Sequence, residues 1–266
     1  MFRVRPGLVD DLANSVVQPM AARAMAQAIV LTGGVSHPFA QAVPVLSDLL
    51  AAAGLAPRCS DSVADVVAWL QQDPHALLVV YALRWSMTQH EKYAPDRARW
   101  AVDLSQPERD AIAGHVLAGG GLLGVHTASL CFDTWPQWRD ILGGTWVWGR
   151  SSHPPWGQVR TCPHPRHVLT RGLEPWDCSD EVYSDLDLTS GIDVAMWARA
   201  TPVDAPSAAP LPEQPSLWTH HYGRGRVVYS ALGHDRRSLL HPTHGRLLRR
   251  AAVWAAGGSD QLLETM

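Results

Sequence analysis

The sequence has few cysteines, no long apolar run and no excess of positive charge. Its four cysteines, Cys59, Cys131, Cys162 and Cys178, stand far apart and form no CxxC pair, which argues against a zinc knuckle and a redox dithiol. No segment approaches the roughly 18 apolar residues that a membrane span needs. A formal net charge of −3 and an isoelectric point near 6.5 offer no basic surface to nucleic acid.

The N-terminus also lacks the uninterrupted apolar core of a secretory signal, because charged residues such as Arg3, Asp10 and Arg23 interrupt it. We therefore expect a cytoplasmic protein with reduced thiols. We interpret 1–27 as an N-terminal extension, 28–258 as a single folded domain and 259–266 as a C-terminal tail. The 266 residues, of which 46% are hydrophobic, suffice for one large domain.

Phenylalanine is scarce and tryptophan abundant, with 3 and 12 residues respectively. Tryptophan serves in cores, in interfaces and in sugar sites, where its flat ring packs on a sugar and its N–H donates a hydrogen bond. The composition leaves these roles open.

Short apolar runs alternate with segments of helical periodicity over most of the chain. The runs predicted as strands are 28–31, 56–59, 77–81, 122–125, 146–148, 158–160, 194–198 and 226–231. Capping boxes at Ser62 and Ser105 begin two of the intervening helices, and Gly54 follows the end of another. This alternation predicts a parallel sheet covered by helices on both faces.

Polar residues directly follow several predicted strands, at the rim where ligands bind in open α/β sheets. His37, His126 and His234 each come shortly after a different strand, so we expect all three on one rim. Arg84 and Trp85 follow another strand and are expected there as well.

Gly124-Val-His126-Thr-Ala128 has the strand–turn–helix context of a nucleophile elbow, with histidine at the tip. We expect this side chain to be exposed. An imidazole there can serve as acid, base or metal ligand, but not as the nucleophile of acyl transfer. Cys131 lies five residues beyond the tip and is expected to be a buried small side chain, so the sequence predicts no glutamine amidotransferase activity.

Six motifs together resemble the ThuA-like (trehalose-utilisation) family. They are Thr32-Gly-Gly with His37, the His126 elbow, Leu142-Gly-Gly144 with His153-Pro154, His167-Val-Leu-Thr-Arg-Gly-Leu173, Asp180-Glu181-Val-Tyr183, and the stretch from Tyr222 to His234. The resemblance implies an α/β fold: a flavodoxin-like, class I glutamine amidotransferase-like three-layer sandwich with a mostly parallel central sheet. It also implies a link to carbohydrate catabolism, especially of 3-keto disaccharides.

Three sets of site residues follow from the rim positions and the resemblance. The catalytic candidates are His126, Glu181 and His234. The substrate-binding candidates are His37, Arg84, Trp85, His153 and Tyr183. The candidate ligands of a divalent metal (Zn, Mn or Fe) are His126, His153, Glu181 and His234, although the sequence leaves open whether any metal is bound.

The sequence is compatible with three kinds of function. The first is an enzyme that isomerises, eliminates or hydrolyses a 3-keto-glycoside through a His/Glu site. The second is a non-catalytic sugar-binding or regulatory module, and the third an amidotransferase-like assembly subunit. The expected partner is a small-molecule sugar or keto-sugar, without nucleic acid or membrane, and a homo-oligomer is left open.

Overall fold

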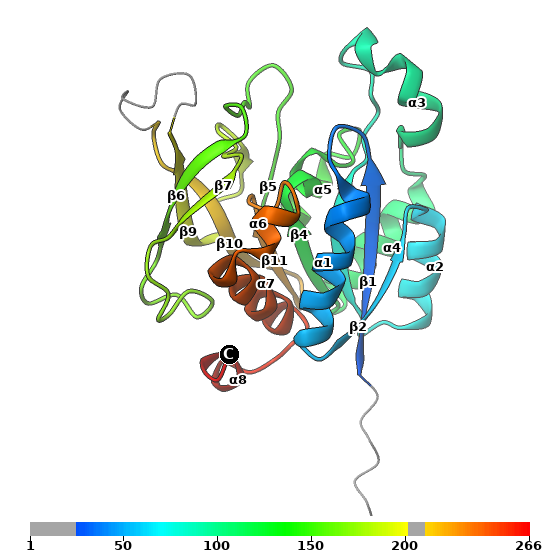
Figure 1. The fold of residues 1–266 in the computed structure, drawn as a ribbon. Coiled ribbons are helices and arrows are strands. Elements are labelled where there is room, and N and C mark those ends of the chain that lie inside the picture. The colour runs from blue at the N-terminus through cyan, green and yellow to red at the C-terminus, as the bar shows by residue number, and fades with distance from the viewer. Residues whose placement is uncertain (1–24, 202–210) are drawn as a thin grey trace, which may run out of the picture.

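The computed structural model describes residues 25–201 and 211–266. Its centre is a nine-stranded sheet in the order β2-β1-β3-β4-β11-β10-β9-β6-β7 (Figure 1). Its strands are β1 (Ala26–Gly34), β2 (Leu55–Ser60), β3 (Leu77–Leu83), β4 (Gly121–Val125), β6 (Gly157–Pro163), β7 (Asp177–Asp180), β9 (Asp193–Ala200), β10 (Gln214–Tyr222) and β11 (Gly225–Ser230). Most of the predicted N-terminal extension, residues 1–24, lies outside the described residues, as do 202–210.

The first half of the sheet is parallel, as the sequence predicted. Strands β2, β1, β3, β4 and β11 pair in parallel. β3 is buried along its whole length, as expected of a strand covered on both faces. Their carboxyl ends therefore meet at one rim of the sheet.

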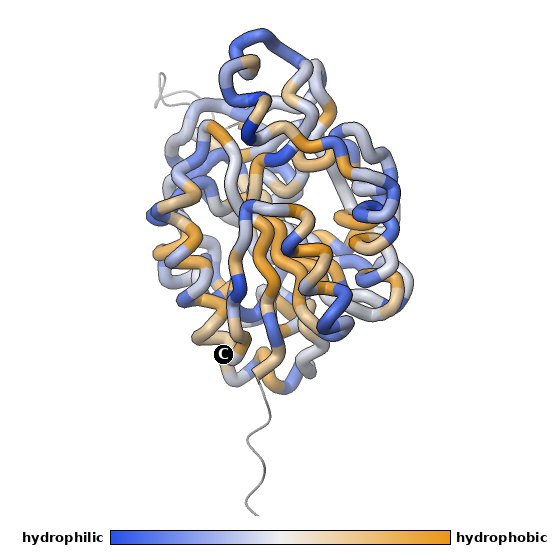
Figure 2. Tube along the Cα trace, turned by 90° about the vertical axis from the view of Figure 1, so that its right-hand side faces the viewer, coloured by the Kyte–Doolittle hydropathy of each residue, from blue (hydrophilic) through white to orange (hydrophobic). Residues whose placement is uncertain are grey.

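Helices cover both faces of the sheet and make three layers. On one face α1 (Phe39–Ala52), α6 (Arg236–Leu240) and α7 (Pro242–Ala255) contribute to one hydrophobic core. On the other face α2 (Val63–Gln72), α4 (Gln106–Leu117) and α5 (Gln137–Leu142) contribute to a second core. Figure 2 shows the hydrophobic strands at the centre of these layers. The predicted flavodoxin-like three-layer sandwich is confirmed.

The second half of the sheet is antiparallel and was predicted only in part. In the order of the sheet, β10 pairs antiparallel with β11, β9 with β10, β6 with β9, and β7 with β6. The predicted strands at 158–160 and 194–198 lie within β6 and β9. β7 was not predicted because its sequence, Asp-Cys-Ser-Asp, has the polarity of a loop.

The strand predicted at 146–148 is wrong. Only the preceding Gly144–Thr145 (β5) is a strand, and it pairs with Asp187–Leu188 (β8). The rings of Trp146 and Trp148 instead pack edge to face at 6.3 Å, so side-chain packing replaces strand pairing here.

Four short helices complete the described elements: η1 (Glu91–Tyr93), α3 (Ala94–Trp100), η2 (His126–Leu130) and α8 (Asp260–Glu264). α8 lies in the segment predicted as a C-terminal tail and buries Leu263. Among the helices described for this chain, none has the length and apolar character needed to cross a bilayer.

Candidate functional site

His126 stands at the end of β4, where the chain turns into the short helix η2 (His126–Leu130). The predicted exposure of this side chain is wrong, because His126 is 0% exposed. Its φ of 50° is a left-handed conformation that non-glycine residues rarely adopt. Its Nδ1 lies 2.7 Å from the carbonyl oxygen of Ala231. Since a carbonyl only accepts, Nδ1 carries the proton, and in the neutral imidazole Nε2 carries the lone pair.

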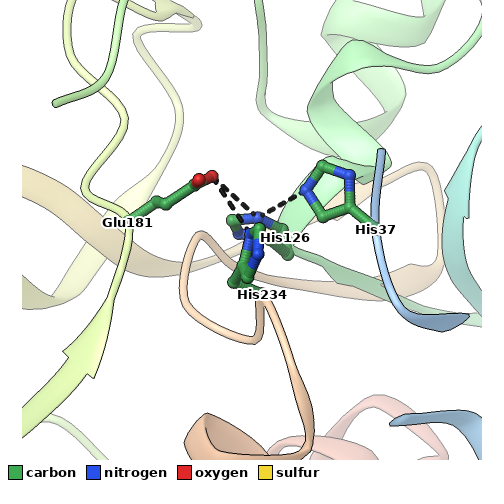
Figure 3. A group of neighbouring side chains, drawn as sticks. All are labelled: His37, His126, Glu181 and His234. Carbon is green, nitrogen blue, oxygen red and sulfur yellow. Dashed lines mark hydrogen bonds and ion pairs between the residues drawn. The ribbon is translucent and has the colours of Figure 1, made fainter. Parts of the chain in front are cut away.

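The side chains of His37, Glu181 and His234 gather around the His126 imidazole (Figure 3). Nε2 of His37 lies 3.1 Å from Nε2 of His126, and Oε2 of Glu181 lies 3.4 Å from the same nitrogen. Nδ1 of His234 is 3.2 Å from the same carboxylate oxygen. One ligand atom from each of His37, His126, Glu181 and His234 lies within 4.8 Å of the others. We call these four residues the His/Glu cluster.

The topology explains why four distant segments meet. His37, His126 and His234 follow β1, β4 and β11, whose parallel carboxyl ends share a rim. Glu181 directly follows β7. Four successive antiparallel pairings separate β7 from β11, so β7 runs in the same direction and ends on the same side. The three predicted rim histidines therefore lie together, and the antiparallel half adds the carboxylate.

Asp180, which the sequence placed in a family motif without a role, holds the loops of Glu181 and His234 together. Its carboxylate is 1% exposed and accepts hydrogen bonds from the backbone N–H of Gly233 at 2.8 Å and of His234 at 3.2 Å. It also accepts from the N–H of Glu181 at 2.8 Å and from the Ser238 hydroxyl. The family motif Asp180-Glu181-Val-Tyr183 includes Asp180, but its role was not predictable because it depends on a loop more than fifty residues later.

Tyr183 and His153 lie at the edge of the cluster. The Tyr183 hydroxyl is 2.9 Å from Nε2 of His126, and its ring packs on Trp146. Nδ1 of His153 is 3.6 Å from Oε2 of Glu181. However, it donates to the carbonyl of Pro154 at 2.9 Å, and the side chain is 37% exposed. The cluster therefore does not include His153, which was predicted as a metal ligand. It includes His37, which was predicted to bind substrate.

Arg84 and Trp85 lie apart from the cluster. Arg84 is buried and donates to the carbonyl of Asp61 at 2.6 Å. Trp85 is 1% exposed and donates to the side chain of Gln89 at 2.8 Å. The contacts of both residues are structural, so their predicted direct binding of substrate has no support in this geometry.

The pKa values within the cluster reflect burial and close packing. Burial and the imidazoles of His126 and His234 lower the pKa of His37 to about 3. Burial opposes ionisation of Glu181, but the imidazoles of His126 and His234 hold its pKa well below the usual range. Burial also opposes protonation of His234, but the Glu181 carboxylate raises its pKa above the ordinary value.

The donor set of the cluster suits a divalent cation. Nδ1 of His37 lies 3.4 Å from the carbonyl of Val35, so both His37 and His126 direct Nδ1–H at a carbonyl and both Nε2 lone pairs inward. Two lone pairs 3.1 Å apart beside a carboxylate repel one another. The Tyr183 hydroxyl, 2.9 Å from Nε2 of His126, can donate to one of them, and a bound cation would attract both lone pairs and the carboxylate. Three of the six separations between the ligand atoms, 3.1, 3.4 and 3.2 Å, are close to the roughly 3.3 Å edge of a tetrahedral zinc site, and all six lie within 4.8 Å.

Cys131 is buried, as the sequence predicted. It is 2% exposed, and its thiol donates to the carbonyl of Ala82 at 3.1 Å. Burial raises its pKa to about 12.

The comparisons with known proteins agree with this architecture. The model of the ThuA family, described as trehalose utilisation, matches residues 27–255. A ThuA-like protein from Parabacteroides merdae superposes with a TM-score of 0.66 at 18% identity, covering 87% of this chain and 90% of its own. A ThuA-like protein from Bacteroides uniformis gives 0.62 at 16% identity, covering 92% and 99%.

A cytoplasmic protein from Salmonella typhimurium has a TM-score of 0.54 at 11% identity, covering 87% and 98%. At these identities the structures are similar in fold. None of the curated proteins matches the sequence. The family match spans most of the sequence, including every residue of the His/Glu cluster, and the chain belongs to the ThuA family of trehalose utilisation.

Proposed function

We propose that this protein acts on a sugar or keto-sugar at a divalent metal held by the His/Glu cluster. The observation that carries the proposal is the convergence of three imidazole nitrogens and one carboxylate oxygen within 4.8 Å. The family description, trehalose utilisation, supports a carbohydrate substrate. The cytoplasmic location expected from the sequence stays a prediction.

The ligands would be His37, His126, Glu181 and His234. Imidazole and carboxylate ligands suit zinc, and also manganese or iron. A cation bound there would polarise a carbonyl oxygen of the substrate. Hydrogen bonds from Nδ1 of His126 and His37 to backbone carbonyls fix the orientation of both rings, as such bonds do for metal-bound histidines.

His153 and Tyr183 are suited to proton transfer and substrate orientation beside the cluster. Because Nδ1 of His153 donates to Pro154, Nε2 of the neutral ring is free to accept a proton. The hydrogen on a carbon next to a keto group is acidic, so His153 can remove it. The Tyr183 hydroxyl, which lies at the cluster, can donate a hydrogen bond to a substrate oxygen. Proton removal of this kind supports isomerisation of a keto-sugar or elimination of its glycosidic bond.

Turnover of 3-ketotrehalose by protein reconstituted with zinc, manganese or iron tests the proposal. We expect His153→Gln to lower kcat/KM by roughly 100-fold or more while the bound metal is retained. Glu181→Gln should lose both activity and metal. The exposed Glu213 provides a control, Glu213→Gln, which should leave both unchanged. Binding of the sugar without turnover would support the alternative of a sugar-binding or regulatory module.

A further inference from the structure

His153, the proposed proton acceptor, lies in a short span of chain with little backbone support. Within the described residues, the backbone of 153–156 takes part in no backbone–backbone hydrogen bond. The span lies between an isolated β-bridge at Ser152 and the start of β6 at Gly157. The position of His153, whose Nδ1 is 3.6 Å from Oε2 of Glu181, therefore depends on side-chain contacts and on the stiffness of the span.

The span is stiff because of its two prolines. Its sequence is His153-Pro-Pro-Trp156, and each proline ring fixes its own backbone φ and restricts the residue before it. Consecutive prolines favour an extended, semi-rigid chain. The placement of the Trp156 ring is therefore transmitted to His153, three residues earlier.

Trp156 is held by a charged side chain from another loop. The guanidinium of Arg237 lies 4.0 Å from the centre of the Trp156 ring, which is a close cation–π contact, and we call it the Arg237–Trp156 stack. Trp156 is half-buried and, among the described residues, belongs to neither hydrophobic core. Its ring N–H has no hydrogen-bond partner in the described part of the chain, so no hydrogen bond orients the ring in place of the stack.

Arg237 is fixed in turn by the loop that carries a cluster ligand. Its Nε donates to Oδ2 of Asp235 at 2.7 Å. Asp235 is buried and caps α6 by accepting from two backbone N–H groups. The cluster ligand His234 directly precedes Asp235. The stack therefore connects the span of His153 to the loop of His234.

We propose that Arg237 and Trp156 are positioning residues, which hold His153 beside the His/Glu cluster through their stack. This role rests on the proposed function, in which His153 removes a proton from the substrate. The Arg237 side chain is 64% exposed, so its truncation should disturb the fold little. Misplacing a catalytic group by about 1 Å can slow a reaction roughly 100-fold, so loss of the stack should affect turnover far more than folding.

The first test follows His153 directly and needs no turnover. The ring centres of His153 and Tyr183 are 5.6 Å apart, so their ring protons should give a nuclear Overhauser effect. We expect Arg237→Ala to weaken or abolish it. The matched control is Arg58→Ala, which removes a guanidinium 3.6 Å from the ring centre of Trp69, outside the cluster, and should leave the effect unchanged. An effect of wild-type intensity in Arg237→Ala would overturn the proposal.

Two variants of Trp156 separate stacking from simple packing. Trp156→Phe keeps an aromatic face for the guanidinium, whereas Trp156→Leu keeps apolar bulk without that face. The Overhauser effect between His153 and Tyr183 should persist in Trp156→Phe and disappear in Trp156→Leu. Its persistence in both variants would show that the stack does not place His153.

Kinetics of metal-loaded protein with 3-ketotrehalose then show whether this placement matters for the reaction. We expect Arg237→Ala to lower kcat roughly 10- to 100-fold, while KM and metal content stay near their wild-type values. If Arg237 acts through His153, the same substitution should cause no further loss in a His153→Gln background. An equal loss of kcat in both backgrounds would overturn the positioning role.

The two kinds of measurement separate this role from the proposed function. Loss of the Overhauser effect in Arg237→Ala would support the placement of His153 by the stack even in a protein that turns over no keto-sugar, which would contradict the proposed function alone. Wild-type turnover by Arg237→Ala would overturn the positioning role and leave the proposed function in place.

Discussion

His126 combines two costly features in one residue. It is fully buried, and its left-handed backbone, with a φ of 50°, costs of order 1–3 kcal/mol for a residue of this kind. The surroundings stabilise this conformation, because the Tyr229 hydroxyl donates to the His126 carbonyl at 2.8 Å and Nδ1 donates to Ala231. Strain of this kind persists where the surrounding contacts over-determine it and is common at functional sites.

Replacing His126 should separate its structural from its functional role. His126→Ala leaves the Ala231 carbonyl without its donor, so we expect a loss of about 1–3 kcal/mol in the free energy of unfolding. His126→Asn should cost less, because asparagine tolerates the left-handed conformation and can donate a hydrogen bond. Urea unfolding measures both values. A loss for Asn as large as that for Ala would contradict this account of the backbone.

Cys131 should be inert as a nucleophile. Because its pKa is raised to about 12, the reactive thiolate forms only when the pH approaches that value, far above neutrality. At about pH 8, we expect iodoacetamide to label the exposed Cys59 and to leave Cys131 unmodified in the folded protein, as mass spectrometry of the peptides would show. Release of ammonia from glutamine that is lost in Cys131→Ser would contradict the prediction that the protein lacks glutaminase activity.

At the scale of elements, the end of β7 and the loop after β11 act as one unit. Asp180 ends β7 and accepts backbone hydrogen bonds from Gly233 and His234. Since Glu181 is the next residue, its position relative to His234 depends on this carboxylate. Asp180 is thus a positioning residue for the cluster.

Asp180→Asn should weaken the binding of metal as well as the fold. The amide replaces an acceptor with a donor that faces N–H and O–H groups, so we expect metal affinity to fall roughly 10–100-fold. Asp133→Asn is the matched control, because Asp133 accepts bonds from Ser86 and Gln89 outside the cluster. It should reduce stability and leave the metal Kd unchanged. An unchanged Kd in Asp180→Asn would contradict the positioning role.

The elements differ in how well the sequence predicted them. Parallel strands such as β3 are continuous apolar runs, and the helix after Ser105 has a capping box, so both were visible. β7 is short and polar, and β10 contains Pro215 and two histidines, so neither has a clear strand pattern. The rim histidines were predictable from strand ends. The hydrogen bonds that Asp180 accepts from Gly233 and His234 were not, because they arise from contacts between distant segments.

At the scale of the whole molecule, the site joins the two halves of the sheet. The parallel half supplies three histidines, and the antiparallel half supplies Glu181 and Tyr183. Neither half alone contains the cluster. A cation bound by both halves stabilises only the folded chain, so metal binding should raise the melting temperature, and the rise should grow with the logarithm of the metal concentration once that exceeds Kd.

The central claim is that the cluster holds a divalent cation rather than a shared proton. Elemental analysis of the purified protein, repeated after chelation and after reloading with zinc, manganese or iron, tests it most directly. We predict about one divalent ion per chain, lost on chelation and regained on reloading. Glu181→Gln and His126→Asn should each abolish binding, whereas replacement of the exposed His75 by Ala should not. A folded protein that neither contains nor takes up any of these ions would contradict the claim, and a shared proton would then account for the contact between His37 and His126.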